Sequence, residues 1–594
     1  SMHDINDKSE QNGYYMNFSL DVDIIKNMLS AKVLYGLNKE NTSRDSYIPS
    51  DIYYALQRKS RGNLGYGKRQ QSTLEGTLTF QHKFGELLDM NLMAGMGRYL
   101  DSGDGSDISY ENANDHIQGS SVGMADGPFY PTSYKYKNEK RSQFVRGSFD
   151  LFGRYVVSAS LRRDGTDKFF PSKKYALFPS VSLAWKMNEE SFIKNISWIN
   201  MLKLRASYGE TGSDNLGTTL YGIVTTTRED VQFNNNSVTY IPYILSGANY
   251  EDVTWQKTVM KNIGLDFSIF RDRIWGSVDV FRNDVTHLLG TAPTELLGMH
   301  GTRPINGGHY KRTGIDVSLN SLNLQTHDFK WTSQITMSHY NAVWIERMPN
   351  YDYQKYQKRK NEPMNAFYYY KTTGIIDMDK SNMPESQRSL GPAACMPGYP
   401  IVEDKNGDGI IDVNDSYMDN MLPKLYFGFG NTFTWKNFDL DIFMYGQLGV
   451  KKWNDAYSYS ADAGNLSRGV DAHNVGIYSY NIWNTQTNMN GHFPGIAISK
   501  SVALPENLGF DYTRENASYI RVRNITLGYN LGPKELSVFK GYIRGIRVFV
   551  DFQNPLTFTK YKGYDPEINT SSSNLTGGQY PQMRVYSIGA KLTF

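Results

Sequence analysis

The sequence is poor in cysteine, in long apolar runs and in net charge, and each shortage excludes a class of protein. Cys395 is the only cysteine, so the chain can form no internal disulfide and no thiolate metal cluster. It lies in the Pro/Gly-rich stretch GPAACMPGYP without a neighbouring histidine, which argues against a catalytic nucleophile. No segment reaches the roughly 18 consecutive apolar residues that a membrane-spanning helix needs.

Charge and motifs argue against nucleic-acid binding and against catalysis. The 63 basic and 60 acidic residues leave a formal net charge of +3, too balanced for a nucleic-acid partner. The sequence shows no HExxH metal motif, no phosphate-binding glycine loop and no serine nucleophile motif. We therefore predict a protein that is not an enzyme and binds no nucleic acid.

What the chain has instead is alternation of polar and apolar residues with a period of two, clearest between residues 154 and 192. The apolar positions are Tyr155, Val157, Ala159 and Leu161, then Leu177, Pro179, Val181, Leu183 and Trp185. Such a pattern predicts two β-strands that each carry one apolar face. A soluble sandwich would turn this face inward, whereas a membrane barrel would turn it to lipid and the polar face to a wet lumen. The alternation by itself allows both.

Three stretches resemble the SusC family of TonB-dependent transporters. The first is RRDGTDKF followed by FPSVSLAW and NEESF, which is similar to the signature hairpin of that family. The second is MLKLRASY followed by GETGSDN, and the third begins WQKTVMKNIGLDF, where Gln256 replaces the glutamate of the family's Trp-Glu pair. The resemblance covers nearly the whole chain but only the C-terminal part of the family.

This resemblance implies an all-β fold, a large antiparallel transmembrane β-barrel with long extracellular loops over residues 1–594. About seventeen strands can be counted, against the twenty-two that the family implies. Neither the family's N-terminal plug domain nor its TonB box is recognisable, so we expect the plug and about five strands to lie outside this sequence. Residues 38–69 and 101–140 are predicted loops, and residues 341–423 form the longest predicted extracellular loop.

Two features near the C-terminus favour a barrel over a soluble fold. In RGIRVFVDFQNP the apolar positions alternate with Arg547, Asp551 and Gln553, which a dry core would hardly tolerate but a water-filled lumen would. The last strand closes with Phe594, which resembles the assembly signal of outer-membrane barrels.

One segment, DKNGDGIIDVND at 404–415, has the spacing of a calcium-binding loop. Oxygen-bearing side chains fall at positions 1, 3, 5, 9 and 12 and a glycine at position 6, as in EF-hand-type loops. The predicted ligands are Asp404, Asn406, Asp408, the Ile410 carbonyl, Asp412 and Asp415. The alternative is a solvated acidic turn, since Asn-Gly and Asp-Gly favour turns. We predict a structural Ca²⁺ that rigidifies an extracellular loop.

The family resemblance implies import of an oligosaccharide, or of a peptide, across the bacterial outer membrane. It also implies a SusD-like surface lipoprotein as a lid, and the TonB complex as an energy source acting through the plug region. Contact with the lipid bilayer follows from the barrel, and the ligand-binding residues stay unknown at this stage. Aromatic runs such as Phe367–Tyr370 could stack on sugar rings or pack within loops. The alternative is a soluble, secreted, calcium-dependent all-β glycan-binding protein.

Overall fold

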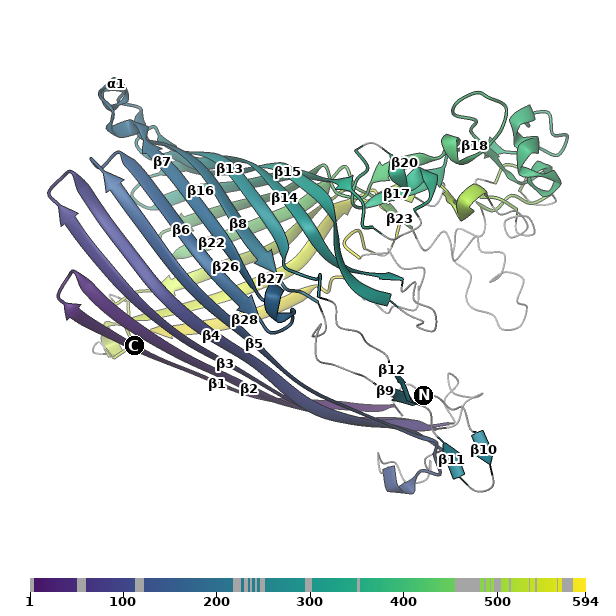
Figure 1. The fold of residues 1–594 in the computed structure, drawn as a ribbon. Helices are drawn as coiled ribbons and strands as arrows, with labels where there is room; N and C mark the ends of the chain where they lie inside the picture. Colours follow the sequence, from purple (N-terminus) through teal and green to yellow (C-terminus); the bar gives the residue numbers. More distant parts are fainter. Residues whose placement is uncertain are drawn as a thin grey trace. The chain divides into compact units, whose positions relative to one another are not determined.

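The computed structural model places most of the chain in β-strands (Figure 1). Of the 594 residues it describes 5–50, 60–112, 122–216, 226–228, 233–235, 238–240, 243–245, 251–293, 302–349, 353–359, 361–454, 481–485, 488–491, 493–495, 504–511, 514–533, 535–539, 542–563, 565–568 and 581–593. Phe594, which the sequence analysis singled out, lies outside the described residues.

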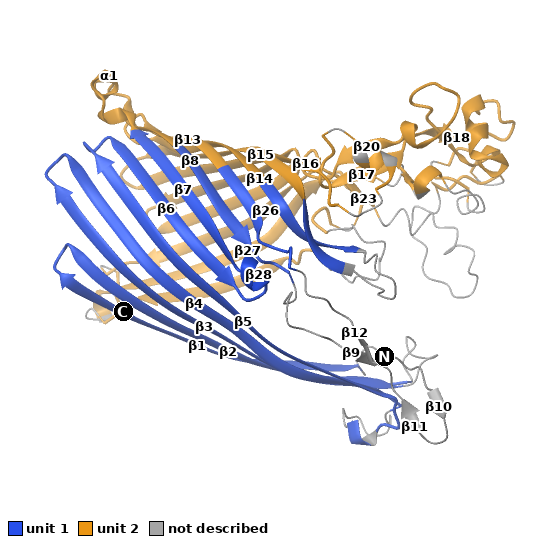
Figure 2. Cartoon of the chain, in the orientation of Figure 1, with its two compact units in different colours: residues 1–185, 206–260, 285–307 blue, residues 186–205, 261–284, 308–594 orange. Residues whose placement is uncertain are grey.

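A single antiparallel sheet of 17 strands dominates the fold, as the strand count predicts. The chain divides into two compact units (Figure 2), and the first comprises residues 1–185, 206–260 and 285–307. From β1 to β7 in this unit, each strand pairs with the next along the chain. These strands are β1 (Asn6–Ile25), β2 (Leu29–Ile48), β3 (Arg61–Phe84), β4 (Leu88–Glu111), β5 (Phe129–Leu151), β6 (Tyr155–Thr166) and β7 (Tyr175–Lys186).

The second unit, residues 186–205, 261–284 and 308–594, continues the same antiparallel pattern. Its later strands again pair in chain order. The sheet strands after β7 are β8 (Ile199–Ser213), β13 (Gln256–Ile269), β14 (Ile274–Pro293), β15 (Thr302–Gln325), β16 (Phe329–Glu346), β21 (Leu425–Trp435), β22 (Phe438–Leu448), β26 (Tyr519–Leu531), β27 (Gly545–Thr559) and β28 (Val585–Thr593).

Short elements occupy the connections between the sheet strands. The small strands are β9 (Thr226–Arg228), β10 (Phe233–Asn235), β11 (Val238–Tyr240), β12 (Tyr243–Leu245), β17 (Ala366–Tyr370), β18 (Thr372–Ile375), β19 (Pro400–Val402), β20 (Tyr417–Asn420), β23 (Lys451–Trp453), β24 (Gly509–Phe510) and β25 (Arg514–Asn516). The one described α-helix is α1 (Ser191–Lys194), and the 3-10 turns include η9 (Val413–Asp415). No helix among the described residues has the length and apolarity to cross a membrane.

The prediction of loops at 38–69 and 101–140 is wrong. β2 continues to Ile48 and β3 starts at Arg61, and these two residues pair directly. Likewise β4 reaches Glu111 and β5 starts at Phe129. Few apolar residues alternate along these segments, yet the strands pair along their length, and pairing satisfies their backbone groups. In β2–β5 the alternation of apolar residues therefore covers only part of each strand, and the strands extend beyond it.

The signature hairpin has the predicted register, and its polarity is inverted relative to a soluble protein. Leu161 lies opposite Pro179 and Val157 lies opposite Leu183, so the apolar residues share one face. That face is exposed: Leu161 keeps 44% and Leu183 keeps 53% of its surface. On the other face Ser160 and Ser180 hydrogen-bond through their hydroxyls at 2.7 Å. Only a lipid environment makes such an apolar exterior favourable.

The predicted long loop at 341–423 contains structure of its own. Two small apolar cores form there, one around Tyr370, Val402 and Ile411 and the other around Ile376 and Tyr399. β17 pairs with β20, and β18 pairs with β19. The segment is therefore a folded insertion rather than an irregular loop.

Candidate ligand site

A polar cavity of about 460 Å³ lies on the face of β1–β5 opposite to the exposed apolar one. Strand register places Asn38 beside Gln71, Gln71 beside Asp101 and Asp101 beside Asn138, so this row brings one side chain from each of β2–β5 to the cavity. The other side chains on this face that line it are Tyr15, Asn17, Thr73, Tyr99, Lys140 and Lys168. The cavity thus presents amides, hydroxyls, a carboxylate and ammonium groups.

Asp101 is the hub of the hydrogen bonds in this cavity. Arg69 donates to both of its carboxylate oxygens, from Nε at 3.1 Å and from Nη2 at 2.7 Å. Gln71 donates to the same carboxylate at 3.3 Å and accepts from Asn38, also at 3.3 Å. Asn138 and Asn17 complete the amide lining. Side chains held in this way present fixed donors and acceptors to a ligand.

Two lysines at the edge of the cavity are held by the signature loops. Lys140 Nζ donates to the Asp214 carboxylate at 2.6 Å, and the Thr166 hydroxyl donates to it at 2.9 Å. Lys168 Nζ donates to the backbone carbonyl of Leu216 at 3.0 Å. Burial alone would raise the pKa of Asp214, but Lys140 and Thr166 outweigh burial and lower it. Asp214 therefore stays ionised and holds Lys140, while backbone carbonyls hold Lys168.

An aromatic core behind these loops joins the three stretches that carry the family resemblance. Phe178 of FPSVSLAW and Trp255 of WQKTV pack edge to face, 5.7 Å between ring centres, and Phe169 packs on the same indole at 5.5 Å. Gly212 of GETG leaves room for the Phe178 ring, because a Cβ there would lie 2.1 Å from it. The motifs are distant in sequence, but together they position Lys168 and Asp214.

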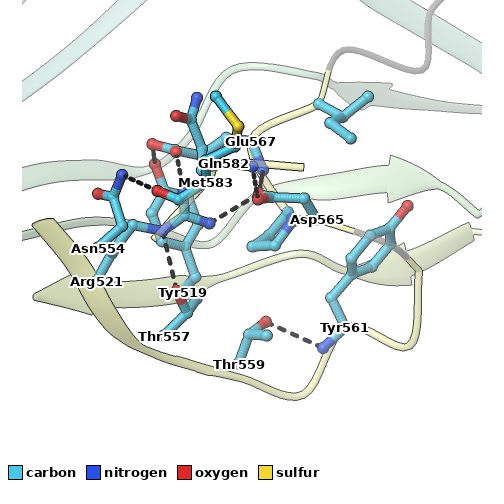
Figure 3. A network of polar contacts seen from close by, with 12 residues as sticks. Tyr519, Arg521, Asn554, Thr557, Thr559, Tyr561, Asp565, Glu567, Gln582 and Met583 are labelled. Carbon is cyan, nitrogen blue, oxygen red and sulfur yellow. Dashed lines mark hydrogen bonds and ion pairs between the residues drawn. The ribbon is translucent and has the colours of Figure 1, made fainter. Parts of the chain in front are cut away.

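The second unit contains a buried ion network around Arg521, which is 2% exposed (Figure 3). Arg521 donates to Asp565 at 2.8 Å and to Glu567 at 2.6 Å, while the Tyr519 hydroxyl also donates to Glu567 at 2.6 Å. Two backbone N–H groups, those of Glu567 and Gln582, donate to Asp565. The network fastens the segment after β27 onto the sheet strand β26, so its role is structural.

The predicted calcium loop is closed by its own hydrogen bonds. The buried Asp415 carboxylate accepts the N–H groups of Lys405 at 2.9 Å and Asp412 at 2.8 Å. Asp404 accepts those of Gly407 at 2.7 Å and Gly409 at 2.9 Å.

Three further predicted ligands of this loop are also engaged locally. Asp408 accepts from Ile410 N, Asn406 accepts from Asp408 N, and Asp412 accepts from Asn414 N. In the described part of the chain, no three His, Cys, Asp or Glu side chains lie close enough together to hold a metal ion. The carboxylates present do not by themselves form a cation site, and calcium binding here stays a prediction.

The aromatic run Phe367–Tyr370 serves mainly as packing. Tyr370 is fully buried and donates its hydroxyl to the Asp412 carbonyl at 3.0 Å. Tyr369 is also buried, and burial raises the pKa of its hydroxyl to about 12.

Sequence reasoning left the ligand-binding residues open, and Asp101, Gln71 and Asn38 show why. They lie in stretches without apolar alternation, two of them in segments predicted to be loops. Their common feature is position on one face, which becomes visible only when the strand register is known. The one indication of a ligand site in the sequence was the high content of Asn and Gln in these strands.

Comparison with known proteins decides the family. The model of the family described as "TonB dependent receptor-like, beta-barrel" matches residues 1–554. The chain belongs to this family. Its members are outer-membrane proteins. The predicted family, fold class and localisation are therefore confirmed, and the alternative of a soluble secreted protein is not supported.

Relatives of this TonB-dependent receptor chain are recognisable at low identity. It is 26% identical to TonB-dependent receptor P3 of Formosa agariphila, over 99% of this chain and 58% of that protein. It is 27% identical to TonB-dependent receptor SusC of Bacteroides thetaiotaomicron, over 78% of this chain and 44% of that protein. The structure of the RagAB peptide transporter superposes with a TM-score of 0.79 at 21% identity, over 100% of this chain and 63% of that one.

The TonB-dependent receptor chain thus spans about half the length of the curated relatives that it matches. The likeness to RagAB shows the fold, including the long sheet of up-and-down strands.

Proposed function

We propose that this barrel imports an oligosaccharide across the outer membrane in a TonB-dependent manner. The observation that carries the proposal is the polar cavity on the inward face of β1–β5. Its side chains are amides, hydroxyls and charged groups, and Tyr15, 70% exposed, offers an open ring for stacking. Sugars need this combination of many hydrogen bonds and a flat aromatic surface.

A peptide is the second candidate, because RagAB, which shares this fold, is a peptide transporter. The cavity disfavours apolar peptides, because its apolar neighbours Leu37 and Leu100 are at alternate positions whose side chains point to the other face. A cavity lined by amides, hydroxyls and charged groups suits a hydroxylated chain better.

Two partners belong to the proposal. A SusD-like surface lipoprotein would cover the extracellular mouth, and the TonB complex would supply energy through a plug region. The similarity to SusC and to the RagAB fold supports this arrangement. The barrel residues would bind and guide the ligand and would perform no covalent step.

Uptake by whole cells tests the proposal. Cells with the intact gene should accumulate a fluorescent oligosaccharide, and cells with the gene deleted or treated with a protonophore should not. Peptides of equal length serve as the comparison. Accumulation of peptides but not of oligosaccharides would replace the first candidate by the second, and equal uptake by deleted cells would refute transport. Purification from membranes should recover a surface lipoprotein with the barrel.

A further inference from the structure

We propose that the outward face of β2–β7 binds an anionic lipid, with its phosphate on three arginines and an acyl chain in an adjoining apolar groove. The three residues are Arg98, Arg141 and Arg163. The site lies on the lipid-facing wall rather than in the lumen, so it is independent of which substrate the protein imports.

The groove consists of two adjoining hollows of about 560 and 720 Å³ on the exposed apolar face. Small residues at outward positions, among them Gly76, Ala94 and Ala159, leave the space. Both hollows share the walls Leu78 and Leu161. A depression of this kind in a bilayer fills with acyl chains because the surrounding solvent is lipid.

The arginines lie where the outward face of β5 changes from apolar to charged. Along this face Val145 is followed by Gln143, Arg141 and Glu139, and Arg98 of β4 lies opposite Arg141. Arg163 pairs with Gln143 and lines the larger hollow. The phosphate site and the groove are therefore continuous.

The charges in this cluster do not balance. Glu139 is the carboxylate that the structure shows bound to it, 2.9 Å from Arg98 Nη2 and 2.5 Å from Arg141 Nε. Arg163 stacks over the Tyr175 ring at 4.1 Å and donates to Gln143 at 3.4 Å. Like charges directly opposite in a sheet are destabilising, and one carboxylate offsets only one of three guanidinium groups. A bound phosphate would supply the missing negative charge.

The position of the cluster along the strands fits the headgroup level. The connections at one end of β3–β6 are short turns, such as Phe152–Arg154, whereas residues 49–60 and 112–128 connect the other ends. Short turns are periplasmic and long loops extracellular in such barrels. Arg98, Arg141 and Arg163 lie at the long-loop end of the apolar band, so the bound lipid belongs to the outer leaflet.

Native mass spectrometry of the protein extracted from its membrane tests the site. The probes are a diphosphorylated lipid A and phosphatidylcholine. We expect retention of lipid A, and about a hundredfold weaker binding by the triple variant R98Q/R141Q/R163Q, since each basic residue contributes about fivefold. The control R154Q removes one charge at the opposite end of β6 and should bind as the wild type does.

Two further variants keep the proposal falsifiable if the triple variant folds poorly. Glu139→Gln removes the competing carboxylate and should strengthen lipid A binding several-fold. Ala159→Trp fills the groove and should weaken it while leaving the arginines in place. Equal retention of phosphatidylcholine, or unchanged binding by E139Q and A159W, would overturn the proposal. Displacement of lipid A by inorganic phosphate alone would show a free-anion site instead of a lipid site.

Discussion

The hydroxyls of Ser160 and Ser180 lie 2.7 Å apart across β6 and β7, on the covered face of the sheet. The residues that follow them, Leu161 and Val181, point to the exposed face. Ser148 and Ser158 repeat the contact at 2.9 Å across β5 and β6. This polar interior and apolar exterior define the protein as a membrane barrel and suggest how to test its orientation.

Reversing polarity on the two faces should have unequal costs. Val181→Arg places a charge in the middle of the outward apolar band and should cost about 2–4 kcal/mol of unfolding free energy. Ser182→Arg, one residue along but facing the polar side, should cost much less. Denaturant titration in lipid vesicles, read by heat-modified gel mobility, measures both. Equal destabilisation would contradict the assigned faces.

Filling the polar cavity should block ligand binding without unfolding the barrel. Asn138→Trp places an indole among Asp101, Gln71 and Tyr99, and we expect at least a tenfold weaker affinity for the transported oligosaccharide. Calorimetric titration of the purified protein gives the affinity. Lys137→Trp, whose side chain faces the opposite side of β5, is the matched control. A normal affinity for N138W would place the ligand site elsewhere.

The aromatic core joining the three motifs should show coupling between Gly212 and Phe178. Gly212→Ala puts a methyl group 2.1 Å from the Phe178 ring, so we expect a loss of about 1–3 kcal/mol. Phe178→Ala alone should cost about 3–5 kcal/mol. The double variant should cost clearly less than the sum, because the truncated side chain relieves the clash. Strict additivity would mean that the two residues do not touch.

Breaking the buried network around Arg521 should loosen the segment after β27. Arg521→Met leaves Asp565 and Glu567 without their cation, and we expect a loss of about 3–5 kcal/mol. Proteolysis of the segment 560–568 in the folded protein reports the effect. Arg523→Met, an exposed arginine on the same strand, is the control and should change little.

The same network predicts a pH dependence. Burial would raise the pKa of Asp565, but the N–H groups of Glu567 and Gln582 and the Arg521 guanidinium lower it overall. A lowered pKa means that ionised Asp565 stabilises the fold above its ordinary pKa and loses this effect as pH falls through the folded value. Protection of the segment should therefore decrease below about pH 4. In Asp565→Asn this decrease should be smaller.

The loop at 404–415 needs two variants, because its stability depends both on the predicted calcium and on the hydrogen bonds of the Asp415 carboxylate. Calcium is expected to raise the melting temperature, and the variant D404A/D408A should abolish that increase. Asp415→Ala should lower stability with or without calcium, because its carboxylate holds backbone N–H groups, each worth about 1.5–3 kcal/mol. Identical melting in calcium and in chelator would refute the calcium prediction and leave the role of Asp415 intact.

The sequence alone determined that residues 155–185 form a hairpin with one apolar and one polar face, because side chains alternate in any strand. It also carried the family resemblance and the number of strands. It failed at residues 38–69 and 101–140, because strand pairing there rests on backbone hydrogen bonds, which require no alternation of apolar residues.

Only the tertiary structure decided which face is exposed and which residues meet. Alternation fixes that Ser160 and Leu161 point opposite ways, but burial depends on what packs against each face. Lys140 and Asp214 are 74 positions apart, and they pair because Phe178 and Trp255 dock the signature loops beside β5. Long-range register, which no local pattern encodes, assembles the cavity on one face of the sheet and the arginine cluster on the other.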